Sequence, residues 1–419
     1  MQALQSALGG GAMSAADLRN RLDVSPATMM RMIRDAGPAV VRVGRGRATR
    51  YALRQTWPNL AHSSFPVFRI SQAGEPSLVG ELVTLAARQS IWLPEGDFED
   101  GLPIALADAR PSGFLGRHFA AVHADLRLPL RISDWSDHHI LLAMSSRGED
   151  LPGDLLVGDE SFARWQTQSA VAASARDYPT LADATIAGHP PGSSAGGERP
   201  KFGVYAEGRH VLVKFAARGS ATDVVARRWS DLLVLESLAL EVIASHGIAA
   251  APTAIIETSE HRFLESERFD RIGSRGRRGV LSLAAVHDDF SDSWAAAATH
   301  LRAAGRITPE DARRLAWLDV FGALIANTDR HHHNIVFFDE AGSLTLAPAF
   351  DQVSMFYAPT ADGQVPDRRF TLPVASATTI EVWGEARLAA LQFWKKGNTD
   401  PRLSAGMQAI CGVNAGLFV

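Results

Sequence analysis

The sequence predicts an α+β protein of several domains, and three observations support that prediction. The chain has 419 residues, enough for two or three domains of roughly 100–200 residues each. Hydrophobic residues make up 46% of the chain and charged residues 21%, a balance that excludes a disordered, collagen-like or coiled-coil protein. Runs with the two-residue period of strands alternate along the chain with runs that have the period of helices.

The composition also excludes several classes of protein. Cys411 is the single cysteine, so one chain cannot build a disulfide framework or a multi-cysteine metal site. The sequence contains no run of about 18 uncharged apolar residues, the length that a membrane span needs. Residues 1–12 lack the basic start and apolar core of a secretory signal. We therefore expect a cytoplasmic protein that has no membrane partner.

Charge is distributed unevenly along the chain. The net charge is only −4, from 42 basic and 46 acidic residues. Residues 1–55 contain nine arginines and three aspartates, a net charge of +6, which leaves −10 for the rest of the chain. A basic segment ahead of an acidic body predicts that the N-terminal segment faces nucleic acid.

The basic segment has the pattern of two helices followed by a hairpin. Ser14 is placed to cap the first helix, and Ser25 the second, with Pro26 at its first position. Two β-rich runs, 40–43 and 49–53, flank a glycine-punctuated basic tip. We predict a winged helix-turn-helix DNA-binding domain over residues 1–57; the alternative is a small helical cap with a solvated arginine face. The side chains expected to contact DNA are Arg31, Arg34, Arg45 and Arg47.

Residues 58–188 predict an α+β subdomain to which we assign no chemistry. Runs 67–70 and 78–85 alternate like strands. His138 and His139 lie beside two aspartates, which allows either a metal site or a polar loop, and the composition favours the loop. Residues 182–197 are rich in glycine, proline and serine at their end and predict a linker.

A glycine- and serine-rich run at 192–197 precedes two strand-like runs, 202–205 and 210–215. Such a loop lets backbone N–H groups approach phosphates, although flexible linkers share this composition. Lys214 is one of only four lysines among 42 basic residues, and it lies in the second apolar strand. A compact ammonium suits phosphate contact there; the alternative is a cation that extends from the strand end into solvent.

The run 227–247 has helical spacing, and Glu236 falls on or beside its apolar stripe. Because an unpaired buried carboxylate is costly, Lys214 is the expected partner, as in the strand-lysine to helix-glutamate pair of protein kinases. The alternative is a glutamate at the boundary of the stripe, in solvent.

A further helix is predicted over 308–327, capped by Thr308 and followed by the run N-T-D-R-H-H-H-N. Strands at 335–338 and 344–346 come next. A hairpin formed by these strands would bring Asp329, Asn334 and Asp351 together, which is the oxygen-ligand set that phosphoryl transfer from Mg²⁺–ATP requires. Residues 331–333, three adjacent histidines, point different ways along a strand or loop, which disfavours the alternative of a zinc site.

These motifs resemble those of the HipA family of bacterial serine/threonine kinase toxins, most closely the YjjJ-type subgroup that carries a fused helix-turn-helix. The resemblance covers residues 65–400 and rests on five runs in the family's order: G-S-S-A-G-G-E-R-P-K, V-L-V-K-F, F-L-E-S-E-R-F-D-R, N-T-D-R-H-H-H-N and A-F-D-Q-V-S. It implies a bilobal α+β fold like that of HipA and protein kinases. The expected domains after the DNA-binding module are a HipA-type N-terminal subdomain at 58–188, a kinase N-lobe core at 189–272 and a mainly helical C-lobe at 273–419.

The resemblance also implies roles for individual residues. Asp329 would be the catalytic aspartate, and Asn334 and Asp351 would hold Mg²⁺. The residues that would contact ATP are Lys214 and His331 near the phosphates, Glu267 and Phe269 around adenine, and Gly196 in the glycine-rich loop. Family members phosphorylate a serine of this loop and thereby switch themselves off. Ser193 matches that position, and Ser194 is a second hydroxyl beside it, so the resemblance leaves open which of the two is modified.

The expected reaction transfers the γ-phosphate of ATP to serine or threonine of a protein, the chain itself included. Some HipA relatives modify an aminoacyl-tRNA synthetase, so such a translation component is one candidate substrate. A separate antitoxin is the family's usual partner, whereas here the DNA-binding module is fused to the kinase. The rival hypotheses are a DNA-binding regulator whose kinase-like body senses a ligand, and a small-molecule kinase of the aminoglycoside-phosphotransferase type. The intact set Lys214, Asp329, Asn334 and Asp351 favours the protein kinase over the sensor, and the HipA-like motifs speak against the small-molecule kinase.

Overall fold

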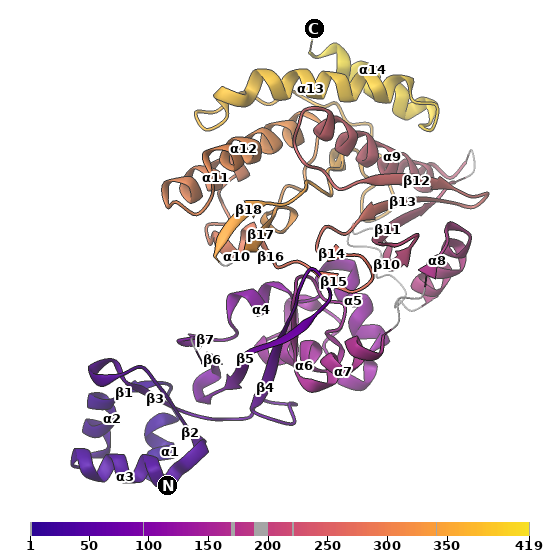
Figure 1. Ribbon diagram of the computed structural model, residues 1–419. Coiled ribbons are helices and arrows are strands. Elements are labelled where there is room, and N and C mark those ends of the chain that lie inside the picture. Colours follow the sequence, from indigo (N-terminus) through magenta and orange to yellow (C-terminus); the bar gives the residue numbers. More distant parts are fainter. Residues whose placement is uncertain are drawn as a thin grey trace. The chain divides into compact units, whose positions relative to one another are not determined.

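The computed structural model describes residues 2–94, 96–168, 172–187, 200–219, 222–340 and 342–418 (Figure 1). The chain divides into two compact units. The first comprises Met1–Ser71, Glu75–Arg110 and His123–Ser169, and the second Gln72–Gly74, Pro111–Val122 and Ala170–Val419. In the part of the chain that the structure describes, every helix is too short or too polar to cross a membrane.

The first unit begins with helices and a small sheet close to those predicted. Ser14 Oγ accepts a hydrogen bond from the Asp17 amide, and Ser25 Oγ accepts one from Thr28, so both serines cap helices as expected. A first helix was not anticipated from the sequence; its Leu4 and Leu8 are buried in the core of this segment. The elements are α1 (Gln2–Leu8), β1 (Met13–Ser14), α2 (Ala15–Leu22), α3 (Pro26–Ala36), β2 (Val40–Val43) and β3 (Arg50–Leu53), with strand order β1-β3-β2.

The remainder of the first unit is an antiparallel five-stranded sheet with helices. Its strand order is β7-β6-β5-β4-β8. Val41 and Ala52 of the N-terminal hairpin are buried with Val83, Leu85 and Ile91 of this sheet, so the two parts share a core. The elements are β4 (Ser64–Ile70), β5 (Pro76–Thr84), β6 (Gln89–Leu93), β7 (Phe98–Asp100), α4 (Ile104–Asp108), α6 (Asp137–Arg147), β8 (Leu155–Val157) and α7 (Asp159–Thr167).

His138 and His139 lie in the first turn of helix α6, whose N-cap is Ser136. Nδ1 of His139 accepts a hydrogen bond from the Ser136 amide at 3.2 Å, and Nδ1 of His138 lies 2.7 Å from Ser136 Oγ. These contacts complete a capping arrangement at the start of α6. Both histidines therefore lie in a helix, and the polar loop that the composition favoured is wrong, because Ser136 starts a helix at this point.

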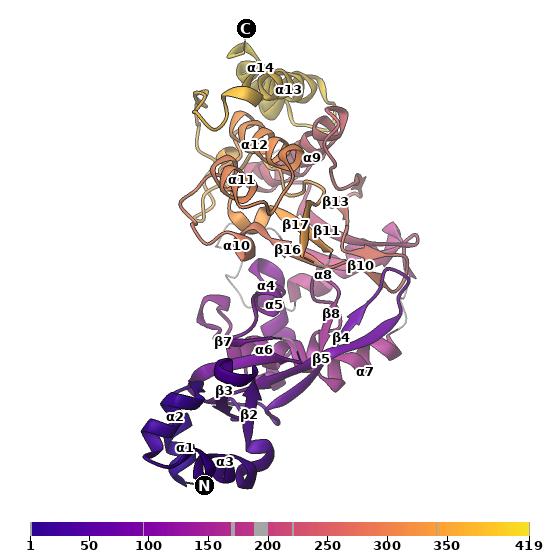
Figure 2. The ribbon, with the colours of Figure 1, turned by 60° about the vertical axis from the view of Figure 1, so that its left-hand side comes forward.

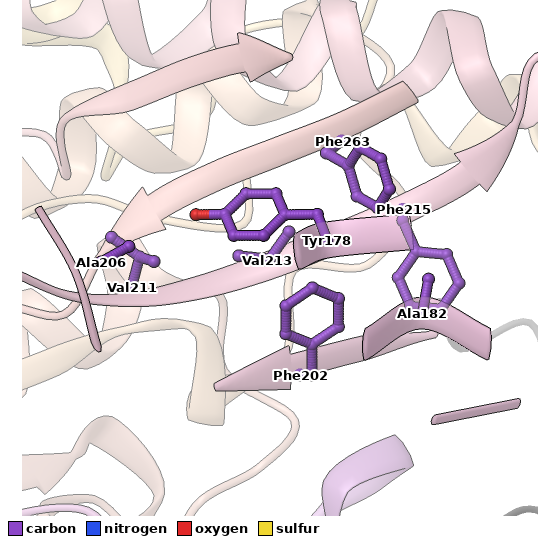
Figure 3. Close-up of a cluster of buried hydrophobic side chains, with 8 residues drawn as sticks. All are labelled: Tyr178, Ala182, Phe202, Ala206, Val211, Val213, Phe215 and Phe263. Carbon is purple, nitrogen blue, oxygen red and sulfur yellow. The ribbon is translucent and has the colours of Figure 1, made fainter. Parts of the chain in front are cut away.

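The second unit contains a five-stranded sheet of order β12-β13-β11-β10-β9, antiparallel except for the short pairing of β9 with β10. Helix α8 covers one face, where aromatic side chains form a compact cluster (Figure 3). Helix α9 packs against the same sheet through Leu233, which is buried with Ala216 and Leu264. The elements are β9 (Ala172–Ala173), α8 (Tyr178–Ala187), β10 (Lys201–Ala206), β11 (Arg209–Ala217), α9 (Val224–Ser245), β12 (Thr253–Glu257) and β13 (His261–Glu267).

The linker predicted at 182–197 is wrong for its first part, because residues up to Ala187 belong to α8. Ala182 is fully buried in the cluster of Figure 3, and the Tyr178 hydroxyl donates a hydrogen bond to Glu265 of β13. Tertiary contacts thus stabilise a helix whose own sequence has little periodicity. Residues 188–197 lie outside the described residues.

The rest of the second unit is mainly helical (Figure 2). Trp294 of α11, Trp317 of α12 and Trp394 of α13 are among the largest fully buried side chains, and each removes a large apolar surface from water. Strands β16, β17 and β18 form a small antiparallel sheet. The elements are α5 (Gly113–Val122), β14 (Arg271–Ile272), β15 (Gly276–Arg277), β16 (Val280–Ser282), α10 (Leu283–Val286), α11 (Trp294–Ala303), α12 (Pro309–Leu324), β17 (Val336–Glu340), β18 (Ser343–Leu346), α13 (Ile380–Thr399) and α14 (Ala405–Gly416).

Candidate active site

The position of Lys214 follows from the alternation of side chains along β11. Val213 and Phe215 point into the cluster beneath α8 (Figure 3). Successive side chains of a strand point to opposite faces, so Lys214 and Ala216 are directed to the other face. Ala216 packs there with Leu233 of α9. The strand therefore directs the Lys214 ammonium toward α9.

Lys214 joins two carboxylates that are far apart in the sequence. Its Nζ lies 2.6 Å from Glu236 Oε1 and 2.6 Å from Asp351 Oδ1. Lys214 is 5% exposed and Glu236 is 2% exposed. These exposures exclude both alternatives left open by the sequence, a lysine extended into solvent and a glutamate at the solvent boundary. The Lys214–Glu236 pair is confirmed, and the contact with Asp351 is an addition that the sequence did not reveal.

Burial and neighbouring charges have opposite effects on the pKa values of these three groups. Burial alone would lower the pKa of Lys214, but Asp351 and Glu236 together raise it above its ordinary value. Burial raises the pKa of Glu236 despite the nearby ammonium. Burial also acts against the Asp351 carboxylate, yet Lys214, with Lys201 and His331, lowers the pKa of Asp351 to about 2. Asp351 is therefore ionised at neutral pH.

The loop after α12 holds Asp329 by its backbone. Helix α12 is followed by Ala326, whose φ of 60° is left-handed and turns the chain out of the helix. Asn327 Oδ1 then accepts a hydrogen bond from the Asp329 amide at 2.9 Å. On the other side, Asn334 Nδ2 donates to the Asp329 carbonyl at 2.8 Å. The Asp329 side chain is 54% exposed, so the loop is anchored while its carboxylate faces outward.

Neighbouring helices anchor the same loop. Arg330 Nε donates to Asp319 Oδ1 of α12 at 3.2 Å, and the Arg330 guanidinium also bonds the Asn327 carbonyl. Asp319 Oδ2 accepts from the Ala295 amide at the start of α11, at 3.2 Å. Trp294 Nε1 donates to the His331 carbonyl at 3.3 Å. The loop 327–334 is thus held by α11 and α12 as well as by its own side chains.

The hairpin predicted after this loop is present, with β17 and β18 paired antiparallel. Asp351 follows the second strand of this hairpin and adopts a left-handed φ of 53°. His331 Nε2 lies 3.8 Å from Asp329 Oδ1, and the charge of His331 also acts on Asp351. Asp351 therefore contacts Lys214 directly, and His331 lies beside Asp329.

Asn334 and Asp351 fit a magnesium site by the chemistry of their donor atoms. A carbonyl oxygen only accepts hydrogen bonds, so the Asn334 atom that faces the Asp329 carbonyl is its amide nitrogen. Asn334 Oδ1 is then left as an oxygen ligand, and the ionised Asp351 carboxylate supplies others. Mg²⁺ prefers such hard oxygen donors.

The three adjacent histidines have different hydrogen-bond or charged neighbours, although the rings of His331 and His333 lie 6.0 Å apart, centroid to centroid. His331 is near Asp329, the buried His332 bonds the Asp292 carbonyl at 3.0 Å, and His333 Nδ1 lies 3.4 Å from Ser282 Oγ. Their imidazoles therefore face three different partners.

The two residues expected around adenine lie at the end of β13. Glu267 is in register with Val211, and its carboxylate is 3.7 Å from the Arg209 guanidinium. The Phe269 ring packs edge-on against Phe338 and lies 5.6 Å from Phe350, the residue before Asp351. Phe269 is thus tied to the segment that carries Asp351. Gly196, Ser193 and Ser194 lie outside the described residues.

The four arginines predicted to contact DNA are all exposed. Arg31 and Arg34 lie on α3, and Arg45 and Arg47 lie at the tip between β2 and β3.

Asn327 and Arg330 lie in the run N-T-D-R-H-H-H-N, but sequence reasoning gave no role to either of them or to Asp319 of the preceding helix. A signal existed for Asp319, because a carboxylate in an apolar helical run requires a partner when it is buried, and this residue is 7% exposed. A signal also existed for Asn327, because asparagine side chains commonly accept a hydrogen bond from the backbone amide two residues later.

Comparisons with known proteins place this site in a family. A model of the YjjJ-like toxin middle domain matches residues 61–166, and a model of the HipA-like C-terminal domain matches residues 193–406. Toxin YjjJ of Escherichia coli is 34% identical over 428 residues, which cover 98% of this chain and 96% of that toxin. The chain belongs to the HipA-like toxin family. The family resemblance inferred from the five motifs is confirmed.

One solved structure shows the same kind of fold. A chain from the complex of Shewanella oneidensis HipA and HipB with operator DNA matches with a TM-score of 0.54 and 13% identity, covering 84% of this chain and 95% of that one. The mixed α+β fold of the family is therefore present here. The proinflammatory kinase CtkA of Helicobacter pylori matches 52% of this chain and 87% of its own, at 11% identity and a TM-score of 0.37, too low to define a shared fold.

Proposed function

We propose that this HipA-like protein is an ATP-dependent protein serine/threonine kinase with a bilobal, kinase-like body. The observation that supports this most is the Lys214 ammonium held 2.6 Å from both Glu236 and Asp351. A strand lysine paired with a helix glutamate, beside an aspartate and an asparagine with oxygen ligands, is the arrangement that positions ATP phosphates in protein kinases. In this proposal the kinase lobes comprise residues 189–272 and 273–419, which follow a HipA-type subdomain at 58–188 along the chain.

The reaction assigns one role to each group. The hydroxyl oxygen of the substrate serine or threonine attacks the γ-phosphorus, the bond from that phosphorus to the β–γ bridging oxygen breaks, and ADP leaves. Asp329 accepts the hydroxyl proton, and its 54% exposed carboxylate is accessible to a protein substrate. Lys214 moves its hydrogen bond from Asp351 to a phosphate oxygen. His331 lies beside the phosphates, and Glu267 and Phe269 line the adenine pocket.

Asn334 and Asp351 would hold Mg²⁺, which offsets the charge of the phosphates when it is bound. Asp351→Ala is expected to abolish Mg²⁺-dependent nucleotide binding, because it removes the carboxylate of this ligand pair. Calorimetry with ATP in the presence and absence of Mg²⁺ measures this. Wild-type affinity in the variant would contradict the role of Asp351.

The direct test of the proposal is phosphoryl transfer. Purified protein incubated with Mg²⁺ and γ-labelled ATP should label itself, and mass spectrometry should place the phosphate on Ser193 or Ser194. Binding of ATP without transfer to the chain or to added protein would favour the rival hypothesis, a DNA-binding regulator whose body senses nucleotide.

Phosphorylation of Ser193 would act as an off-switch. It adds about −1.5 to −2 charges at pH 7 to a loop proposed to lie against the ATP phosphates, with Gly196 among the residues that contact them. Like charges would then share one pocket, so phosphorylated protein should bind ATP more weakly than unmodified protein. Equal affinities would show that the loop is no switch.

The N-terminal segment is proposed to be a winged helix-turn-helix domain that binds DNA. Its support is the helix–turn–helix–hairpin order with Arg31, Arg34, Arg45 and Arg47 exposed. Replacing Arg45 and Arg47 with alanine should weaken binding to duplex DNA and reduce its salt dependence, since each removes a phosphate contact. Fluorescence anisotropy at several salt concentrations measures both the affinity and its salt dependence. An unchanged salt slope would exclude the hairpin tip as a DNA contact.

We propose two further partners. One is a protein substrate, such as a translation component, and the other is a separate antitoxin.

A further inference from the structure

A cluster of metal-ligating side chains lies outside the site described above. It comes from the segment between α10 and the middle of α11. His287 Nε2 is 2.9 Å from Asp292 Oδ2, and His300 Nδ1 is 3.0 Å from the same oxygen. Ligand atoms of His287, Asp292 and His300 all lie within 4.8 Å of one another, and no other such group occurs in the described parts of the chain.

The hydrogen bonds of this cluster define which ring atoms face inward. A carboxylate oxygen only accepts hydrogen bonds when ionised, so His287 Nε2 and His300 Nδ1 both direct N–H groups at Asp292 Oδ2. Two imidazole nitrogens and one carboxylate oxygen therefore converge on a single point. A metal ion can replace the two protons there once each imidazole offers a lone pair, either by losing its proton or by shifting it to the other ring nitrogen.

We propose that His287, Asp292 and His300 bind a divalent transition-metal ion of the zinc type. Two imidazoles and one carboxylate are the donors of three-ligand zinc sites, in which water completes the shell. Imidazole nitrogen suits Zn²⁺, Co²⁺ and Ni²⁺, whereas Mg²⁺ prefers oxygen donors. The site is therefore distinct in chemistry from the oxygen-ligand pair Asn334 and Asp351.

The surroundings of Asp292 support a site of defined geometry. His332 is 4% exposed, and its Nε2 must donate the hydrogen bond to the Asp292 carbonyl, because that oxygen can only accept. His332 Nδ1 is buried and lacks a hydrogen-bond partner among the described residues. The His332 ring lies 5.8 Å from the ring of His287, centroid to centroid. A buried imidazole thus orients the backbone of the carboxylate ligand, as outer partners of metal sites do.

The same contacts connect the cluster to the loop that carries Asp329. His332 belongs to that loop, and Trp294, two residues after Asp292, donates to the His331 carbonyl. A metal ion would cross-link the chain before α11 to the second turn of that helix. It would thereby stabilise the segment against which the loop 327–334 is held.

Zinc binding to the full-length, tag-free protein tests the proposal. Protein treated with a chelator and then freed of it is titrated with ZnCl₂ in competition with a chromogenic chelator. We expect one tight equivalent, a rise in the unfolding temperature with Zn²⁺, and visible absorption bands when Co²⁺ replaces Zn²⁺. His300→Ala should weaken binding by more than about tenfold, since it removes one of three ligands. Because the His300 side chain is 63% exposed, this variant should fold normally.

Two further variants make the result specific. Asp292→Asn keeps the size of the side chain but removes the anionic ligand, and should weaken binding to a similar degree. His62→Ala is the matched control, because His62 is an exposed histidine outside the cluster, and binding should be unchanged. Absence of a tight equivalent in wild-type protein would overturn the proposal. So would binding that survives both His300→Ala and Asp292→Asn, which would place the zinc on other histidines. These readouts do not involve phosphoryl transfer, so they stand whether or not the chain is a kinase.

Discussion

The two halves of the candidate active site place ionisable side chains in opposite surroundings. Lys214, Glu236 and Asp351 have side chains that are 6%, 2% and 27% exposed, and they form two ion pairs of 2.6 Å. Asp329 and His331 are 54% and 50% exposed, and Oδ1 of Asp329 is 3.8 Å from Nε2 of His331. The first half is held together by charge. The second half is held by the backbone hydrogen bonds of Asp329 to Asn327 and Asn334.

This difference shows that solvent exposure determines which interaction positions an ionisable side chain. A buried charge must be paired, since desolvation without a partner costs several kcal/mol per ion. An exposed pair gains about 0–1 kcal/mol and cannot hold a geometry by itself. Asp329 is therefore placed by its main chain, which leaves its carboxylate accessible. We expect substitutions in the first half to lower the stability of the fold. Substitutions in the second half should instead lower the rate of phosphoryl transfer.

The largest expected effect is on the exposed half. Asp329→Asn keeps the shape of the side chain but removes the group proposed to accept the hydroxyl proton, and losses of roughly 10²–10⁴ in rate are typical for such a group. Autophosphorylation with labelled ATP measures the rate, and thermal unfolding measures the stability, which should not change. A variant that labels itself at the wild-type rate would remove Asp329 from the mechanism.

Next in size is the buried pair. Glu236→Ala leaves Lys214 buried with one carboxylate fewer, and breaking a buried pair costs about 3–5 kcal/mol. Urea unfolding measures the change in the free energy of unfolding.

The matched control for Glu236→Ala lies on the same helix. Glu241 pairs with Lys396 at 2.5 Å, but these side chains are 59% and 36% exposed. Glu241→Ala should therefore cost only about 0–1 kcal/mol. If the two variants lose equal stability, burial is not what distinguishes the pairs.

A smaller effect concerns pH. Because the pKa of Asp351 is lowered to about 2 in the folded protein, from about 3.9 in an unfolded chain, its ionisation stabilises the fold above the higher value. That stabilisation, on the order of 2 kcal/mol, is lost as pH falls from about 4 toward 2. The difference in unfolding free energy between wild type and Asp351→Asn should stay constant from pH 8 to pH 5. It should then shrink between about pH 4 and pH 2, whereas a difference that stays constant down to pH 2 would show that the pKa is not lowered.

The smallest expected change in stability comes from His331→Gln. This histidine is 50% exposed and 3.8 Å from Asp329, so the variant should unfold within about 0.5 kcal/mol of wild type. A loss above about 2 kcal/mol would show that the exposed half also depends on its charges for stability.

The sequence by itself determined the local elements and one long-range pair. Ser14, Ser25 and Thr308 cap helices as predicted, because capping depends on residues within one turn. The pairing of Lys214 with Glu236 could be inferred, because a carboxylate on an apolar stripe needs a cation and this chain has few lysines. The elements that carry Asp329, Asn334 and Asp351, a helix, a loop and a hairpin, were also predictable from local periodicity.

Only the tertiary structure decided the contacts that depend on where distant segments meet. Asp351 reaches Lys214 across 137 positions of sequence, and no local pattern encodes that distance. Helix α8 forms where the composition predicted a linker, since Tyr178 and Ala182 are buried against a sheet formed mostly by later residues. The convergence of His287, Asp292 and His300 likewise depends on how the segment before α11 folds back on that helix. Caps and periodicity act within a few residues, whereas burial and ion pairing are properties of the whole packed chain.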